Sequence, residues 1–187
     1  SVSYAAVELA RHIFGDLTGK TVMLVGAGEM AELAATHLLA AGVENMLVAN
    51  RTLSRAQELA GRFKAEAVPF SDLFARLAEA DIVISSTGAT QTVVQARDVN
   101  KVMKQRKHRP MFFIDIAVPR DIDPDANSLD NVYLYDIDDL REVVEENLAQ
   151  RQEEAARARL IVREEVQRFN VWLRSLELKP TIVDLLD

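Results

Sequence analysis

TVMLVGAGEMA, residues 21–31, runs from a β-branched apolar segment through a glycine-rich turn into an alanine-rich and leucine-rich segment. Thr21–Val25 has the length of a buried strand, and Glu29–Ala41, with Gly42 just past its end, has the composition and the stop signal of a helix. A strand that passes through glycines directly into a helix is the first half of a βαβ unit. This stretch therefore predicts an α/β fold.

Outward from this unit, strand and helix patterns alternate along the chain. Further strands are predicted at Met46–Ala49, Ala65–Val68, Asp81–Ser85, Met111–Ile116 and Val132–Tyr135. Further helices are predicted from Ser3 as cap to Gly15, from Thr52 or Ser54 as cap to Phe63, and from Ser71 onward. Apolar strands separated by amphipathic helices are typical of a parallel sheet covered on both faces. We therefore predict a doubly wound, mostly parallel, Rossmann-type sheet.

The C-terminal part of the chain has a different composition. No glycine or proline occurs between Asp138 and Pro180. This predicts one long C-terminal α-helix of roughly 40 residues, Asp138–Leu178, on the order of 60 Å long. Residues 150–159 are polar or alanine and are expected to be exposed, whereas a second apolar group follows them: Leu160, Ile161, Phe169, Trp172, Leu173 and Leu176. We therefore expect three parts, an N-terminal helix packed on the next domain (1–16), a Rossmann domain (17–137) and the long helix (138–187).

Composition excludes several kinds of function for these 187 residues. The formal charge of −7 disfavours binding of nucleic acid by the surface as a whole. Because the chain has no cysteine, it forms no disulfide, cysteine metal site or thiol nucleophile of its own. No apolar run reaches the length of a membrane span, and we expect a cytoplasmic protein that makes no membrane contact. The start at Ser1 fits a processed protein or an excised fragment, and we favour the fragment.

The glycine turn predicts a site for a pyrophosphate. Gly26 permits the tight turn, and Gly28 removes the side chain that would keep a pyrophosphate away from the backbone. The N-terminus of the following helix offers N–H groups and partial positive charge to the same anion. The alternative is a glycine-rich turn without a ligand. The predicted binding residues are Gly26, Ala27, Gly28, Glu29, Met30 and Ala31, the last as a small residue for helix–strand packing.

The end of the second strand predicts the kind of dinucleotide. A site for NAD usually carries an acid here for the ribose 2′-hydroxyl, but this chain has Asn50-Arg51-Thr52. Arg51 offers a planar fork of donors to a 2′-phosphate, and Arg55 lies one helical turn further on. We therefore predict NADPH as the cofactor, bound here by Asn50, Arg51, Thr52 and Arg55. The alternative is that both arginines are solvated surface charges.

The later strands end in residues that could serve the nicotinamide side of the cofactor. The fourth ends in small polar residues, and the predicted ligand contacts are Ser85, Ser86, Thr87 and Gly88. After the fifth, Ala117 and Val118 could pack on the nicotinamide ring. Asp115 and Arg120 are open between a buried pair that anchors the loop and direct chemistry.

No catalytic or metal-binding residue is predicted. Asp136, Asp138 and Asp139 fit helix-capping and first-turn acids better than a metal cluster. The three histidines, His12, His37 and His108, have no partner at ligand spacing, so none is assigned to catalysis.

Five stretches together resemble one family. They are SVSYAAVELA (1–10), the loop Gly26–Ala31, Asn50-Arg51-Thr52, IDIAVPRDI (114–122) and YDIDDL (135–140), and they resemble the glutamyl-tRNA reductases over nearly the whole chain. The last two stretches, in this order, are more specific than the glycine loop, which the related shikimate dehydrogenases share along with Asn-Arg-Thr.

The resemblance implies an activity for the parent protein. That family is an NADPH-dependent oxidoreductase that reduces glutamyl-tRNA to glutamate-1-semialdehyde, which opens tetrapyrrole (porphyrin) synthesis, through a thioester on a cysteine. Because this chain has no cysteine, it resembles only the NADPH-binding domain and the start of the helix that leads to the dimerisation domain. The implied partners are glutamyl-tRNA through the missing catalytic domain, a second subunit through the C-terminal helix, and the aminomutase that follows in the pathway. We expect this chain alone to bind NADPH and to leave glutamyl-tRNA unreduced.

Two other functions compete with this interpretation. One is a shikimate- or quinate-dehydrogenase-like NADP oxidoreductase, whose catalytic lysine and aspartate would lie in a substrate domain that is also missing. The other is a non-enzymatic nucleotide-binding module that dimerises through the long helix.

Overall fold

The computed structural model describes residues 2–184, with side chains described except at 147 and 175–184. The chain divides into two compact units, Ser1–Val144 and Glu145–Asp187.

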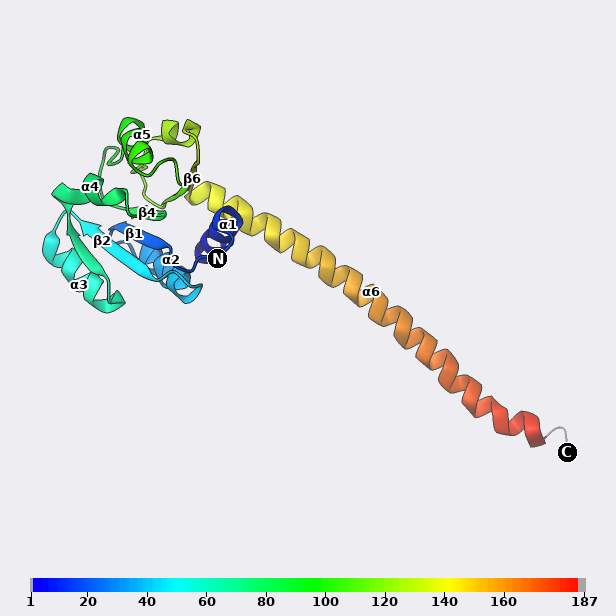
Figure 1. Cartoon of the computed structure of the whole chain (residues 1–187). Helices are drawn as coiled ribbons and strands as arrows, with labels where there is room; N and C mark the ends of the chain where they lie inside the picture. The colour runs from blue at the N-terminus through cyan, green and yellow to red at the C-terminus, as the bar shows by residue number, and fades with distance from the viewer. Residues whose placement is uncertain (1, 185–187) are drawn as a thin grey trace. The chain divides into compact units, whose positions relative to one another are not determined.

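The first unit is built on a sheet of six parallel strands (Figure 1). The strands are β1 Thr21–Gly26, β2 Asn45–Asn50, β3 Glu66–Pro69, β4 Ile82–Ser86, β5 Met111–Asp115 and β6 Val132–Asp136. Their order in the sheet is β3-β2-β1-β4-β5-β6, so the chain winds outward from β1 in one direction and then returns to β4 to wind in the other. The predicted doubly wound, Rossmann-type sheet is confirmed, and each predicted strand lies within one residue of an observed one.

Helices join the strands. They are α1 Val2–Phe14, α2 Glu29–Ala40, α3 Leu53–Phe63, α4 Leu73–Leu77, α5 Ala96–Gln105 and α6 Ile137–Asp184, with short 3₁₀ turns η1 Phe70–Asp72 and η2 Pro124–Ser128. The sequence analysis did not predict α5. Its signal was one narrow apolar stripe, Val99, Val102 and Met103, at helical spacing within a polar segment.

Alternate residues of each central strand enter two different cores. On one face of the sheet, β1 residues Val22 and Leu24 pack with α1, α2 and α3, and with Leu140 at the start of α6. On the other face, Met23 and Val25 pack with α4 and α5. This two-residue period explains the continuous apolar runs in the sequence, because a parallel strand covered by helices on both faces needs apolar side chains at every position.

Three predicted helix starts need correction. Ser3 is not a cap, because it lies inside α1 with 4% of its surface exposed. Ser71 lies within η1, and Asp72 is the residue that precedes α4. Thr52 does occupy the position before α3, but its side chain accepts no hydrogen bond from the helix.

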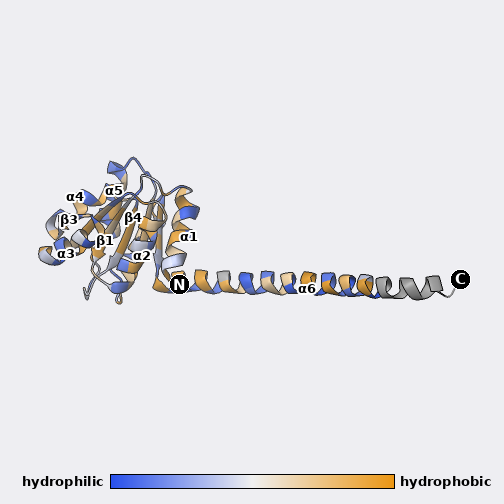
Figure 2. Cartoon of the chain, turned by 90° about the horizontal axis from the view of Figure 1, so that it is seen from below, coloured by the Kyte–Doolittle hydropathy of each residue, from blue (hydrophilic) through white to orange (hydrophobic). Residues whose placement is uncertain are grey.

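The second unit consists of α6 residues from Glu145 onward. The predicted polar stretch 150–159 is exposed throughout. Beyond it Leu160, Ile161, Phe169, Trp172 and Leu173 are also exposed, and the rings of Phe169 and Trp172 lie 5.6 Å apart. Figure 2 shows hydrophobic residues recurring along this helix among hydrophilic ones. Leu176 lies outside the residues whose side chains are described, and the helix continues past Pro180 to Asp184. Within the described part of the chain, no helix is long and apolar enough to cross a membrane.

Candidate functional site

A hollow of about 460 Å³ lies at the carboxyl ends of β1 and β4, the two strands between which the winding reverses. Gly26 at the end of β1 pairs in register with Ser86 at the end of β4. The hollow is lined by Gly26–Gly28, by Asn50–Thr52 with Arg55, by Ser86–Ala89, and by Phe70 and Val93. In open α/β sheets this reversal point is where ligands bind, because the connecting loops diverge there.

Both glycines of the turn are required by their contacts with β4. Gly26 has a φ of +99°, and a Cβ on it would fall on the backbone carbonyl of Ser86. A Cβ on Gly28 would fall on the Ser86 hydroxyl oxygen. The sequence analysis gave Gly28 the task of admitting a pyrophosphate. The structure shows in addition that its missing side chain makes room for Ser86.

The helix that follows the turn begins without a side-chain cap. Gly28 is the residue before α2, and no side chain bonds to the first N–H groups there. Ala31 is fully buried at the helix–sheet contact, whereas Glu29 and Met30 are exposed and do not line the hollow. The first turn of α2 can therefore present its N–H groups to an anion in the hollow.

The opposite side of the hollow carries two guanidinium groups. Arg51 and Arg55 both line it, and both are exposed. They flank the N-terminus of α3, whose first turn contains no acid. Asn50 Oδ1 accepts a hydrogen bond of 3.0 Å from Thr52 N and so shapes this turn. Two cations at the positive end of a helix repel each other, and an anion between them would relieve that repulsion.

The loop after β4 is held by a residue that the sequence analysis did not single out. Asp121 is fully buried, and its Oδ2 accepts hydrogen bonds from Ser85 Oγ at 2.7 Å and from Thr87 N at 2.8 Å. Its Oδ1 accepts a hydrogen bond from the Thr87 hydroxyl. Ser85 therefore faces Asp121 and does not line the hollow, whereas Ser86, Thr87 and Gly88 do.

Phe70, Ala89 and Val93 also line the hollow and were not predicted from the sequence. Ala89 and Val93 belong to the loop that Gly88 opens, and Phe70 follows β3, the strand with the weakest pattern. A signal was available for Phe70, since it stands directly after a strand end.

Asp115 anchors the loop that follows β5. Its carboxylate is almost fully buried and accepts hydrogen bonds from Ala117 N at 3.1 Å and Ile122 N at 2.8 Å. Burial raises the pKa of this carboxyl above its ordinary value, and the nearby charge of Asp121 adds to the shift, while the backbone N–H groups of Ile122, Ala117 and Asp121 oppose it. Arg120 forms an ion pair with Asp136, whereas a buried pair with Asp115 was one of the two alternatives that the sequence left open.

Ala117, predicted to contact the nicotinamide, is nearly buried at 5% exposure directly after β5, and it does not line the hollow. Val118, which precedes a cis proline, is 83% exposed.

The acids near residue 136 cap α6, as predicted. Asp136 Oδ1 accepts hydrogen bonds from the N–H groups of Asp138 and Asp139, at 2.8 and 2.9 Å. Asp139 Oδ2 accepts one from Asp136 N at 2.8 Å, which completes a reciprocal capping box. Among the described residues no group of three or more acids or histidines is arranged to hold a metal ion.

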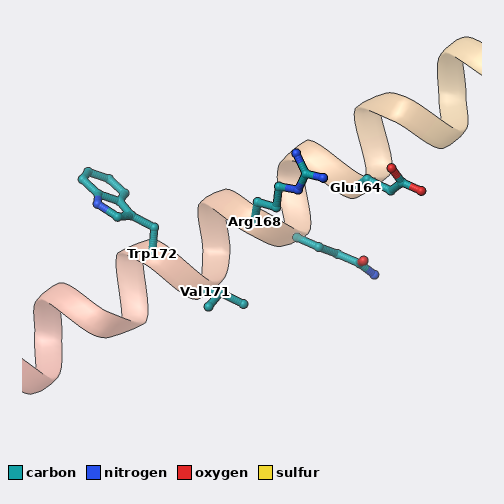
Figure 3. A pocket seen from close by; sticks show the side chains of 5 residues that line it. Glu164, Arg168, Val171 and Trp172 are labelled. Atoms are coloured by element: carbon teal, nitrogen blue, oxygen red, sulfur yellow. The ribbon is translucent and has the colours of Figure 1, made fainter.

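A second hollow lies along α6 and is lined by Glu164, Gln167, Arg168, Val171 and Trp172 (Figure 3). All its lining residues come from one helix, with no glycine turn or strand end beside them. The hollow at the strand ends is therefore the candidate site.

The strand order, the glycine turn and the uncapped helix define a nucleotide-binding domain of the Rossmann type, the fold of nicotinamide-dependent dehydrogenases. The chain belongs to the shikimate / quinate 5-dehydrogenase family, which residues 8–143 match.

Over its whole length the chain is also similar to glutamyl-tRNA reductases, as the sequence analysis predicted. The glutamyl-tRNA reductase of Solidesulfovibrio magneticus is 71% identical over 187 residues, which are 100% of this chain and 41% of that protein. The structure of glutamyl-tRNA reductase from Methanopyrus kandleri matches with a TM-score of 0.80 and 41% identity, over 94% of this chain and 44% of that one. This chain thus spans about four-tenths of the length of these two glutamyl-tRNA reductases.

The nucleotide-binding domain of glutamyl-tRNA reductase from Thermoplasma volcanium matches with a TM-score of 0.61 over 82% of this chain and 97% of that one. At 21% identity it supports the fold alone.

Proposed function

We propose that this chain is the NADPH-binding domain of a glutamyl-tRNA reductase, the enzyme that uses NADPH to reduce glutamyl-tRNA to glutamate-1-semialdehyde for tetrapyrrole synthesis. One observation carries the proposal. Arg51 and Arg55 line the hollow at the reversal of the sheet, and none of the described residues that line this hollow carries a carboxylate. This donor set fits a 2′-phosphate, which an acid at the same position would repel.

The proposed contacts follow the three sides of the hollow. Gly26–Ala31 and the start of α2 would hold the pyrophosphate. Asn50, Arg51, Thr52 and Arg55 would hold the adenosine 2′-phosphate. The β4 end, Ser86–Gly88, would serve the nicotinamide side, with Ser85 acting from behind through Asp121. Ala117 after β5 does not line the hollow, and its proposed contact with the nicotinamide rests on the sequence alone. When bound, NADPH supplies the hydride, and the chain's own residues bind and orient it.

The parent protein's other properties are proposals that rest on this family. Glutamyl-tRNA would be bound and attacked by a cysteine in a separate catalytic domain. The long helix 138–187 would lead to a dimerisation domain, and residues 1–16 would link the catalytic domain to the Rossmann domain (17–137). The next enzyme of the pathway, an aminomutase, and a cytoplasmic location complete the proposal. Since this chain contains no cysteine, we expect it to reduce no glutamyl-tRNA by itself.

A shikimate- or quinate-dehydrogenase-like enzyme is the second candidate, and the family match over residues 8–143 favours it. That match ends near the start of α6, whereas the similarity to glutamyl-tRNA reductase extends through all 187 residues. The long helix is therefore the region that separates the two candidates and supports the first.

The test is a fluorescence titration of the wild-type chain and Arg51→Ala with NADPH and with NADH. We expect NADPH to bind more tightly than NADH, and the substitution to weaken NADPH by about 10-fold to 100-fold, the range for a charge-assisted hydrogen bond, while NADH changes little. Arg97→Ala serves as the charge-matched control, because Arg97 is an exposed arginine on α5 that does not line the hollow. Equal losses for both cofactors would contradict the 2′-phosphate assignment.

A further inference from the structure

The segment 87–93, which is part of the connection from β4 to α5, forms a wall of the site that also contains Arg51. Gly88, Ala89 and Val93 line the main hollow. The whole segment from Gly88 to Val93 also lines an adjoining hollow of about 390 Å³, together with Arg51 and Phe70. The wall therefore lines the same two hollows as Arg51, the residue that our proposed function assigns to the adenosine 2′-phosphate.

One buried residue, Asp121, holds both ends of this wall. At the first end its carboxylate accepts hydrogen bonds from the N–H and the hydroxyl of Thr87, and the Thr87 oxygen in turn accepts one from Ala89 N at 3.1 Å. At the other end the main-chain carbonyl of Asp121 accepts hydrogen bonds from Val93 N at 2.7 Å and Val94 N at 3.0 Å.

Burying a carboxylate at position 121 has a free-energy cost. Asp121 is 0% exposed, and a second buried carboxylate, Asp115, lies close enough for the charge of Asp121 to act on it. A buried charge is unfavourable unless its hydrogen bonds are well formed, and Asp121 accepts three at its side chain. The two oxygens of the Asp121 carboxyl group accept from the N–H and the hydroxyl of Thr87 at the same time, which holds Thr87 in one geometry.

We propose that Asp121 is a positioning residue of the NADPH site. It does not touch the cofactor. Through Thr87 and Val93 it sets the wall, whose first residues, Thr87 and Gly88, serve the nicotinamide side and whose remainder, residues 89–93, serves the adenosine end beside Arg51. This inference rests on the proposed function and adds to it a residue, 34 positions along the chain from Thr87, that controls affinity from behind the wall.

The experiment measures binding of NADPH and of adenosine 2′,5′-bisphosphate, which carries the adenosine half alone. Asp121→Asn is the direct variant. Thr87→Val removes only the hydroxyl that links Asp121 to Ala89, and Thr87→Ser restores that hydroxyl. We expect Asp121→Asn and Thr87→Val to weaken both ligands by about 10-fold, on the scale of one lost buried hydrogen bond, and Thr87→Ser to recover most of the loss.

Asp81→Asn is the matched control, because Asp81 is also buried and also accepts both a backbone N–H and a side-chain donor, but before β4 and away from the hollow. Asp81→Asn should lower the melting temperature and leave the affinities for both ligands unchanged. This result would show that a loss of stability alone does not weaken binding.

If Thr87→Val bound adenosine 2′,5′-bisphosphate as tightly as the wild type, the inference would be overturned, even if Asp121→Asn lost binding. So would equal losses of affinity in Asp81→Asn and Thr87→Val. Failure of the wild-type chain to bind either ligand would instead remove the proposed function.

Discussion

The two edges of the same sheet use arginine in opposite ways. At the amino edge, Arg106 has a fully buried side chain, which donates hydrogen bonds to Asp81 Oδ1 at 2.8 Å and to the carbonyls of Ala78 and Pro110 at 2.8 and 3.0 Å. At the carboxyl edge, Arg51 is exposed beside the hollow. The guanidinium of Arg106 stabilises the fold, whereas that of Arg51 is available to a ligand.

The direction of the helices explains the difference. In a parallel sheet with crossover helices, helices end at the amino edge and begin at the carboxyl edge. Ala78 and Arg106 are the C-terminal cap residues of α4 and α5, so the buried guanidinium lies where helix carbonyls need donors. Arg51 and Arg55 lie at the beginning of α3, where a cation is disfavoured unless an anion joins it. An arginine at the N-terminus of a helix, where the dipole disfavours a cation, therefore indicates a binding site better than an arginine at a helix C-terminus.

The largest effect is expected at the closed edge. Arg106→Met should lower the free energy of unfolding by about 3–5 kcal/mol, because it leaves Asp81 buried without its cation. Chemical denaturation measures this loss, and the double variant Arg106→Met/Asp81→Asn should recover part of it. If the single variant were as stable as the wild type, Arg106 would not be closing that edge. Burial lowers the pKa of Arg106. Among the described residues, Nε of Arg106 is the buried side-chain nitrogen without a hydrogen-bond partner, so part of the free-energy cost of burying this guanidinium is not offset.

An intermediate effect is expected at the open edge, and it should differ between two neighbouring glycines. Gly26→Ala should destabilise the domain by about 2–4 kcal/mol, since Gly26 needs positive φ and its Cβ would meet backbone. Gly28→Ala should cost less stability, because its Cβ meets the movable Ser86 side chain, yet it should weaken NADPH binding. Melting curves with and without NADPH compare the two, and equal stability losses would contradict the assignment of fold to one glycine and ligand access to the other.

The smallest effect concerns Asp115, also at the open edge. Because the pKa of Asp115 is raised in the folded chain, ionisation of this carboxyl opposes folding. The protonated carboxyl contributes its full stabilisation at pH values below the unfolded-state pKa, and this contribution to the free energy of unfolding is lost as the pH rises through the folded-state pKa. The stability cost of Asp115→Asn should therefore be larger near pH 4 than at pH 7, by on the order of 1 kcal/mol. Denaturant titrations at both pH values measure the difference, and a cost that grows with pH would have the wrong sign.

Much of the fold was predictable because strands and helices leave local patterns. The strands β1, β2, β4, β5 and β6 are apolar runs, and the reciprocal cap of α6 is visible in the acids near residue 136. The helix α5 was missed because only three of its side chains are buried, too few to stand out from a polar segment.

The candidate site was predictable in its ligand-facing half. The glycine turn and Arg51 follow their strands directly, and the structure brings them together with Ser86–Gly88 around one hollow. The contacts behind the hollow, which support its lining residues, were not predictable. Ser85 was expected at the ligand but faces Asp121, and Arg120 pairs with Asp136 where Asp115 was considered.

The order of strands and helices, the glycine turn and the lack of an acid beside Arg51 can be read from the residues alone, because each of these features depends on spacings of a few residues. The support that Asp121 gives to Ser85 and Thr87 depends instead on how the chain folds in three dimensions. That contact spans 36 residues from Ser85, and it forms because β4 and β5 pair side by side and bring the loops at their carboxyl ends together.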